Sequence, residues 1–113
     1  MLFSLNNGYK TVHKIYSLIN PINNSVFYVG CTGKTLKERL AFHLSAARSE
    51  PGSYKKRAYI NSIINSGYIP VIKILQEVES TTFNEFLKVI DTERYWIRYF
   101  KDKTQLVNTK HMV

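Results

Sequence analysis

The sequence predicts an α+β domain in which a small antiparallel sheet of three strands is flanked by helices, in the order β-β-α-α-β-α. Near the N-terminus, two segments rich in β-branched and aromatic residues stand on either side of a turn cluster, which is typical of a hairpin. Three segments with helical spacing of apolar residues follow, and another strand-like segment separates the second from the last. The 113 residues, 44% of them hydrophobic, suffice for one core, so we expect a single domain over residues 1–113.

The predicted hairpin comprises residues 13–19 and 25–30, joined by the turn sequence NPINN. If this loop of about five residues is centred on Ile22, Tyr16 faces Tyr28 directly. The two tyrosines would then be cross-strand neighbours on one face of the sheet.

Two helices are expected after the hairpin. Thr35 and Glu38 form a capping-box pattern, and the helix that they open should run to about Ser49. The second helix covers residues 54–66 and ends with Gly67 in the C′ position. The inward-facing side chains of the two helices are expected to be those of Leu36, Leu40, Leu44, Ala47, Ile60, Ile63 and Ile64.

The segment VIKILQEV after Pro70 predicts the third strand, with Ile72, Ile74 and Val78 on its more apolar face. Thr82 opens a second capping-box pattern and starts a long helix that should run to about Lys101. The remaining tail is expected to be a loop or a short extended piece.

A single carboxylate interrupts the apolar stripe of the last helix. Glu93 falls among residues with helical spacing, and a carboxylate there is costly unless it is paired, protonated or bound to a metal. The alternative is that Glu93 lies at the border of the stripe and reaches solvent or an arginine. The apolar members of the stripe are Phe86, Ile90, Ile97 and Phe100.

Positive charge dominates the chain, with 16 basic against 8 acidic residues and a net charge of +8. An excess of this size favours a polyanionic partner, nucleic acid before membrane. Many of the basic residues lie between positions 34 and 57, either as solvated surface residues or as a stripe for a phosphate backbone. The candidate nucleic-acid-binding residues are Lys34, Lys37, Lys55, Lys56 and Arg57.

Several classes of protein are excluded or made improbable by what the sequence lacks. One cysteine, Cys31, permits no internal disulfide, and the scattered histidines offer no structural zinc site. No apolar run is long enough to cross a bilayer, and the N-terminus does not resemble a secretory signal. We therefore expect an intracellular protein, cytoplasmic or associated with the nucleoid (nuclear in a eukaryotic host), with no membrane partner.

Arg39 and His43 are one helical turn apart, so both side chains can converge on one target. The planar guanidinium suits a phosphate, and an imidazole can exchange a proton near neutral pH. The simpler alternative is a solvated Arg39 beside a packed His43.

Taken together, these residues resemble the GIY-YIG nuclease family over roughly residues 13–110. The sequence KIY ending at Tyr16 stands for the first motif of the family, with Lys14 in place of its glycine, and YVG at 28–30 matches the second. Further along the chain, four residues resemble the polar positions that follow these two motifs in the family: in order, Arg39, His43, Glu93 and Asn108.

The resemblance implies a GIY-YIG-like fold and hydrolysis of phosphodiester bonds in DNA with one divalent metal, Mg²⁺ or Mn²⁺, held by Glu93. Tyr16 would help to deprotonate the attacking water with Tyr28 beside it, although the two could be exchanged, and a nearby cation would have to lower the pKa of the phenol. Arg39 would hold the phosphate, and His43 would relay a proton or bind phosphate. Asn108 would position Glu93 or the backbone.

We also expect a monomer that needs no small-molecule cofactor. Because the chain ends five residues after Asn108, we expect no separate DNA-targeting domain of the kind that members of this family usually carry. Two alternatives stay open: a catalytically inactive nucleic-acid-binding module on the same fold, and a basic protein whose target is another protein.

Overall fold

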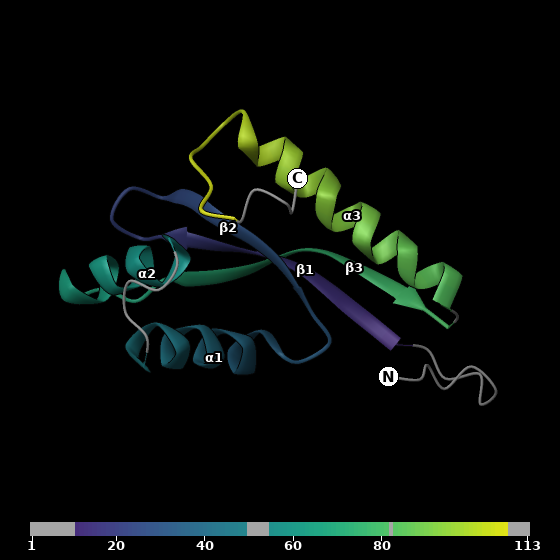
Figure 1. Ribbon diagram of the computed structural model, residues 1–113, viewed down its shortest axis with the longest axis horizontal. Coiled ribbons are helices and arrows are strands. Elements are labelled where there is room, and N and C mark those ends of the chain that lie inside the picture. The colour runs from purple at the N-terminus through teal and green to yellow at the C-terminus, as the bar shows by residue number, and fades with distance from the viewer. Residues whose placement is uncertain (1–10, 50–54, 82, 109–113) are drawn as a thin grey trace.

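The structure, a computed structural model, describes residues 11–49, 55–81 and 83–108 and has the predicted element order (Figure 1). Strands β2 (Ser25–Thr32), β1 (Thr11–Asn20) and β3 (Val71–Ser80) lie side by side in that order as one antiparallel sheet, with β1 in the centre. The predicted α+β class and its order are therefore confirmed. The elements are β1 (Thr11–Asn20), β2 (Ser25–Thr32), α1 (Leu36–Ser49), α2 (Lys55–Asn65), β3 (Val71–Ser80) and α3 (Phe83–Lys101).

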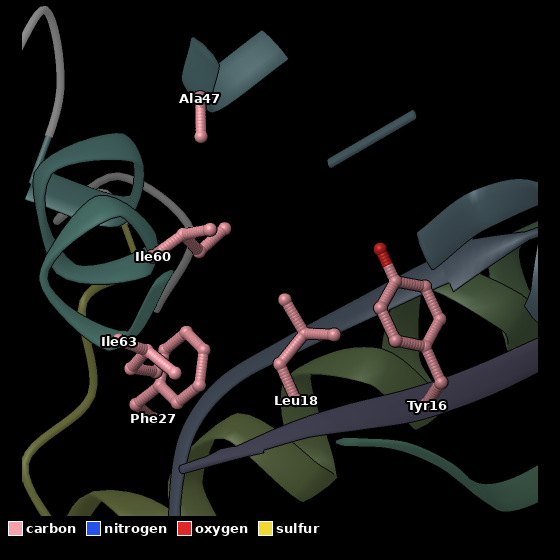
Figure 2. Packing of buried hydrophobic residues seen from close by; sticks show 6 residues of the cluster. All are labelled: Tyr16, Leu18, Phe27, Ala47, Ile60 and Ile63. Carbon is pink, nitrogen blue, oxygen red and sulfur yellow. The ribbon is translucent and has the colours of Figure 1, made fainter. Parts of the chain in front are cut away.

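Both faces of the sheet are covered, because side chains of the central strand alternate between them. Helices α1 and α2 lie on one face and α3 on the other (Figure 1). On the first face, Leu18 packs with Phe27 and with Ile60 and Ile63 of α2, while Tyr16 stands at the end of this cluster (Figure 2). On the second face, the neighbouring Ile15 packs with buried residues of β2 and α3. The two cores share β1, which fixes the position of Tyr16 from both sides.

The predicted hairpin register is wrong. Tyr16 pairs with Gly30, and Leu18 is the residue opposite Tyr28. Residues 21–24 form a four-residue loop, and a β-bulge beside Leu18 shifts the register again. Tyr28 therefore lies diagonally from Tyr16, and the rings remain neighbours, with centroids 6.3 Å apart.

The bulge has a packing cause. Phe27 and Tyr28 are consecutive, yet both contact the core beneath α1 and α2, while Val26 and Val29 contact the opposite core. A regular strand would send consecutive side chains to opposite faces. The bulge lets Phe27 stack on Tyr59 of α2, at 4.4 Å between centroids, without turning Tyr28 away.

Strand β3 does not keep one apolar face, contrary to the expectation for Ile72, Ile74 and Val78. Ile72 packs on the α1–α2 side, whereas Leu75 and Val78 pack on the α3 side, and Ile74 is 44% exposed. A register shift between β1 and β3 at this point reverses the alternation.

The predicted ends of the first two helices are observed. Glu38 accepts hydrogen bonds from the backbone and hydroxyl of Thr35, whose hydroxyl accepts from the Glu38 N–H, so the capping box is complete. After α2, Gly67 has a φ of 89°, the left-handed conformation expected of a C′ glycine.

Helix α3 begins at Phe83, directly after the predicted cap, and ends at Lys101 as expected. Thr82, the predicted cap itself, lies outside the described residues, and Glu85 accepts hydrogen bonds from the N–H and hydroxyl of Thr81. Across the described part of the chain, no helix combines the length and the apolar character needed to cross a membrane.

The segment 104–108 covers the outer edge of β2. The Val107 N–H donates to the Phe27 carbonyl at 2.7 Å. The Asn108 side chain accepts from the Val29 N–H at 3.1 Å and donates to the Val29 carbonyl at 2.8 Å. These bonds pair an edge that would otherwise expose backbone groups, and among the described residues they extend as far as Val29, the residue before Gly30.

Candidate active site

The hydroxyl of Tyr16 is the centre of a polar cluster in an otherwise apolar core. It lies 2.7 Å from Nε2 of His43 and accepts a hydrogen bond from Nε of Arg39 at 3.0 Å. Tyr16 has no exposed surface, and His43 is 1% exposed. Because Arg39 and His43 are one turn apart on α1, both side chains reach the same oxygen, as their spacing suggested.

Burial and positive neighbours keep His43 neutral. Burial lowers the pKa of His43 to about 3, with a further contribution from the charges of Lys56 and Arg39. Within the described residues, Nδ1 of His43 has no hydrogen-bond partner. The bond at Nε2 therefore sets the position of the ring proton: Nε2 accepts from a phenol when the proton is on Nδ1, or donates to a phenolate when the proton is on Nε2.

The pKa of Tyr16 is raised, and the cation bonded to it, Arg39, does not by itself bring it below its ordinary value; lowering by a metal ion stays a prediction. Burial is the largest cause, followed by Tyr28, and the hydrogen bond and charge of Arg39 oppose them without prevailing. A proton on Tyr16 does not move spontaneously to a His43 with so low a pKa. In the protein alone, His43 orients the hydroxyl, and its role as a proton relay or phosphate ligand stays a prediction.

Gly30 makes this arrangement possible. A Cβ atom at this position would lie 2.5 Å from the Tyr16 hydroxyl, 2.6 Å from its Cζ and 2.8 Å from Cε2 of Tyr28. Real side chains do not tolerate such distances, so both aromatic rings lie where only a glycine allows them.

We expect Gly30→Ala to destabilise the protein by about 1–3 kcal/mol through overpacking and to displace the Tyr16 hydroxyl from its partners. Gly33→Ala is the matched control, since a Cβ at Gly33 meets nothing within 4 Å. Thermal unfolding of the two variants checks this. Equal midpoints would show that Tyr16 has room to move.

Tyr28 borders the same cluster from β2. Its ring lies 5.4 Å from that of His43, and Nζ of Lys56 lies 4.9 Å from its centroid. Burial raises the pKa of Tyr28, and the charge of Glu93 raises it further. Among the described residues, no hydrogen bond involves its hydroxyl. Tyr28 is therefore a ring that shapes the site, with a hydroxyl free for an outside partner.

Lys56 also belongs to this cluster, whereas the sequence predicted only that it binds nucleic acid. It is partly buried, and its pKa is lowered by burial and then by the charges of Arg39 and Arg57. A signal was present in the sequence: Lys56, Ile60 and Ile63 share the spacing of one helix face. Of the other candidates, Lys34, Lys37 and Lys55 are exposed, whereas Arg57 is partly buried like Lys56.

Glu93 enters the site from the opposite layer. It is partly buried on α3, and burial raises its pKa, while the charges of Arg94 and Arg39 act in the other direction. Its charge in turn raises the pKa of both tyrosines. Glu93 is thus within electrostatic reach of the groups around Tyr16, and a cation beside it would relieve the cost of its burial.

The donor set fits one hard divalent cation with few protein ligands. No group of three or more histidine, cysteine or acidic side chains capable of holding a metal occurs in the described parts of the chain. Mg²⁺ needs no such group, because it commonly keeps several waters and binds through one carboxylate together with substrate phosphates. Glu93 offers that carboxylate.

Asn108 lies beside the site and holds its backbone. Both polar atoms of its side chain are bonded to Val29, the residue between Tyr28 and Gly30. The structure therefore places Asn108 as a positioning residue for β2, the second of its two expected roles.

Comparison with known proteins gives one match. The family model of the GIY-YIG catalytic domain matches residues 12–106, most of the chain. This range includes Tyr16, Glu93 and the residues of α1, and the resemblance found in the sequence is confirmed. No curated protein and no solved structure matches the chain.

Proposed function

The chain belongs to the GIY-YIG family, a family of nuclease-type catalytic domains, and from this premise we propose that it is a metal-dependent endonuclease that hydrolyses phosphodiester bonds in DNA. The observation that carries the proposal is the Tyr16 hydroxyl, buried between Arg39 and His43 and within the field of Glu93. A merely structural tyrosine gains little from three ionisable neighbours supplied by two helices on opposite sides of the sheet.

Each side chain has a role in the proposed reaction. Tyr16 acts as the base in its phenolate form, after its own proton has left to solvent: the phenolate oxygen takes a proton from the attacking water, and His43 keeps that oxygen oriented. Arg39 has donors besides the Nε–H that Tyr16 occupies, and these stabilise the charge that develops on the phosphate. Glu93 would hold a Mg²⁺ or Mn²⁺ ion, and the charge of that ion would stabilise the leaving oxygen and favour the phenolate of Tyr16.

The net charge of +8 and the exposed Lys34, Lys37 and Lys55 support a nucleic-acid substrate, since contacts to phosphates dominate such binding. Incubating the full chain with supercoiled plasmid tests the proposal. Nicked or linear product should form with Mg²⁺ or Mn²⁺ and should not form in EDTA. Retention of plasmid without cutting, at any metal concentration, would instead identify an inactive binding module.

Lys56→Met should slow cleavage by about tenfold to a hundredfold, because it removes a positive charge beside Tyr28 and the phosphate site. The same change should raise the pKa of His43, on which the charge of Lys56 acts. Cleavage rates and an NMR titration of the His43 ring measure the two effects.

Lys55→Met is the control, because it removes the same charge from an exposed neighbour on the same helix. It should weaken DNA binding slightly and leave the pKa of His43 unchanged. If the two variants behave alike, Lys56 acts only through general electrostatic attraction.

A further inference from the structure

The outer surface of α3 carries an aromatic patch, formed by Tyr95, Trp96 and Tyr99, that has no part in the site around Tyr16. Tyr95 is 58% exposed and Tyr99 41% exposed, and the partly buried Trp96 lies edge-to-face against both, with ring centroids 5.3 and 5.4 Å away. Single exposed apolar residues are ordinary, but three adjoining rings on one helix indicate a binding surface.

A shallow hollow opens at this patch and has polar groups at its rim. Its lining comprises Tyr95 and Trp96 together with Gln76, Asp91 and Thr92. The Trp96 Nε1–H donates to Oε1 of Gln76 at 2.9 Å, which fixes the indole plane. Asp91 is exposed and can accept hydrogen bonds from amino groups. Flat aromatic walls with polar groups at their edge suit a planar heterocycle.

Cations surround the patch. Lys103 lies over Tyr99, with Nζ 4.2 Å from the ring centroid. Lys88 is two turns before Tyr95 on the same helix face, and Arg98 is nearly one turn after it, and both are exposed. Exposed rings interleaved with positive charges are the combination that binds single-stranded nucleic acid, where bases stack and phosphates pair with the cations.

We propose that the aromatic patch stacks an unpaired base of a DNA strand that extends from the cleavage site. The choice of DNA as the ligand rests on the proposed function. Glu93 lies two residues before Tyr95 on the inner side of α3, and a helix is only about 10 Å across, so a strand held at the active site reaches the patch. Base pairs in a duplex are already stacked on each other, so the patch discriminates unpaired from paired DNA.

Trp96 is the one tryptophan of the chain and therefore reports directly on the patch. The experiment titrates the full chain, in EDTA so that no cleavage occurs, with an unpaired oligothymidine while the Trp96 emission is recorded. Saturable quenching is expected. Tyr95→Ala should weaken the binding by about fivefold or more, as loss of one stacking ring does, and Tyr95→Phe should restore it.

Tyr68→Ala is the matched control, because Tyr68 is 51% exposed but lies in the loop before β3; its affinity should equal that of the wild type. The inference is overturned if Tyr95→Ala binds as tightly as the wild type, or if a blunt duplex quenches Trp96 equally. It is also overturned if the emission changes with protein concentration alone, because a second copy then covers the patch. Metal-dependent cutting without quenching would refute only this inference, whereas quenching without cutting would refute only the nuclease.

Discussion

The Glu93→Gln variant should cleave DNA at least about a thousandfold more slowly than the wild type and yet unfold at a higher temperature near neutral pH. Both effects have one cause. Burial raises the pKa of Glu93, so an ionised carboxylate at this position lowers the free energy of unfolding. Glutamine has the same shape without the charge. The carboxylate that the proposed reaction requires therefore lowers the stability of the folded protein when no cation is bound beside it.

The sign of the pH dependence follows from the direction of the shift. The folded state holds the Glu93 proton more tightly than the unfolded chain, whose ordinary pKa is about 4.5. The wild type must therefore lose stability, relative to Glu93→Gln, as the pH rises from that value through the raised pKa, and the difference becomes constant above it. Thermal unfolding midpoints of the two proteins across this range measure the effect, without metal and again with Mg²⁺.

Mg²⁺ should narrow the difference in stability, since an ion that binds the folded wild type stabilises it and has no ligand in the variant. Asp102→Asn is the control, because Asp102 is an exposed carboxylate just after α3, and it should change neither cleavage nor the midpoint. Equal midpoints for wild type and Glu93→Gln at every pH would show that Glu93 is fully solvated and would weaken the case for a metal at this position.

The parts of the fold that could be predicted are those fixed by residues close in sequence. The capping box of Thr35 and Glu38 and the left-handed Gly67 each depend on a single turn of chain, and both are observed. The hairpin register depends instead on distant packing: the bulge exists because Phe27 and Tyr28 both find partners beneath α1 and α2. The sequence of residues 13–30 does not indicate that Phe27 stacks on Tyr59, which lies on a helix far along the chain.

The same distinction applies to the site. The convergence of Arg39 and His43 follows from helical spacing and could be predicted, but the state of the group on which they converge could not. A cation beside a phenol suggests a lowered pKa, and only the depth of burial shows that desolvation prevails at Tyr16. Lys56 was missed because a lysine in a basic stretch is usually solvated, although its spacing to Ile60 placed it on the buried face of α2.

Tyr16→Phe should reduce cleavage by about 10²–10⁴-fold, the usual contribution of a positioned general base. It also removes the hydroxyl that pairs with Arg39 and His43, which should cost about 1–3 kcal/mol in the free energy of unfolding. Cleavage rates with chemical denaturation of the same preparation measure both. Unchanged stability would mean that water replaces the lost hydroxyl in this cluster.

Tyr28→Phe separates the two tyrosines, because it removes a hydroxyl that has no hydrogen bond among the described residues and leaves its ring in place. It should lose less activity than Tyr16→Phe and almost no stability. The pH–rate profile then decides the assignment. A buried phenol with a raised pKa is mostly protonated near neutral pH, so the wild-type rate should climb with pH as the phenolate becomes more abundant. Tyr16→Phe should flatten that climb and Tyr28→Phe should retain it; the reverse pattern would move the base to Tyr28 and leave Tyr16 as the residue that orders Arg39 and His43.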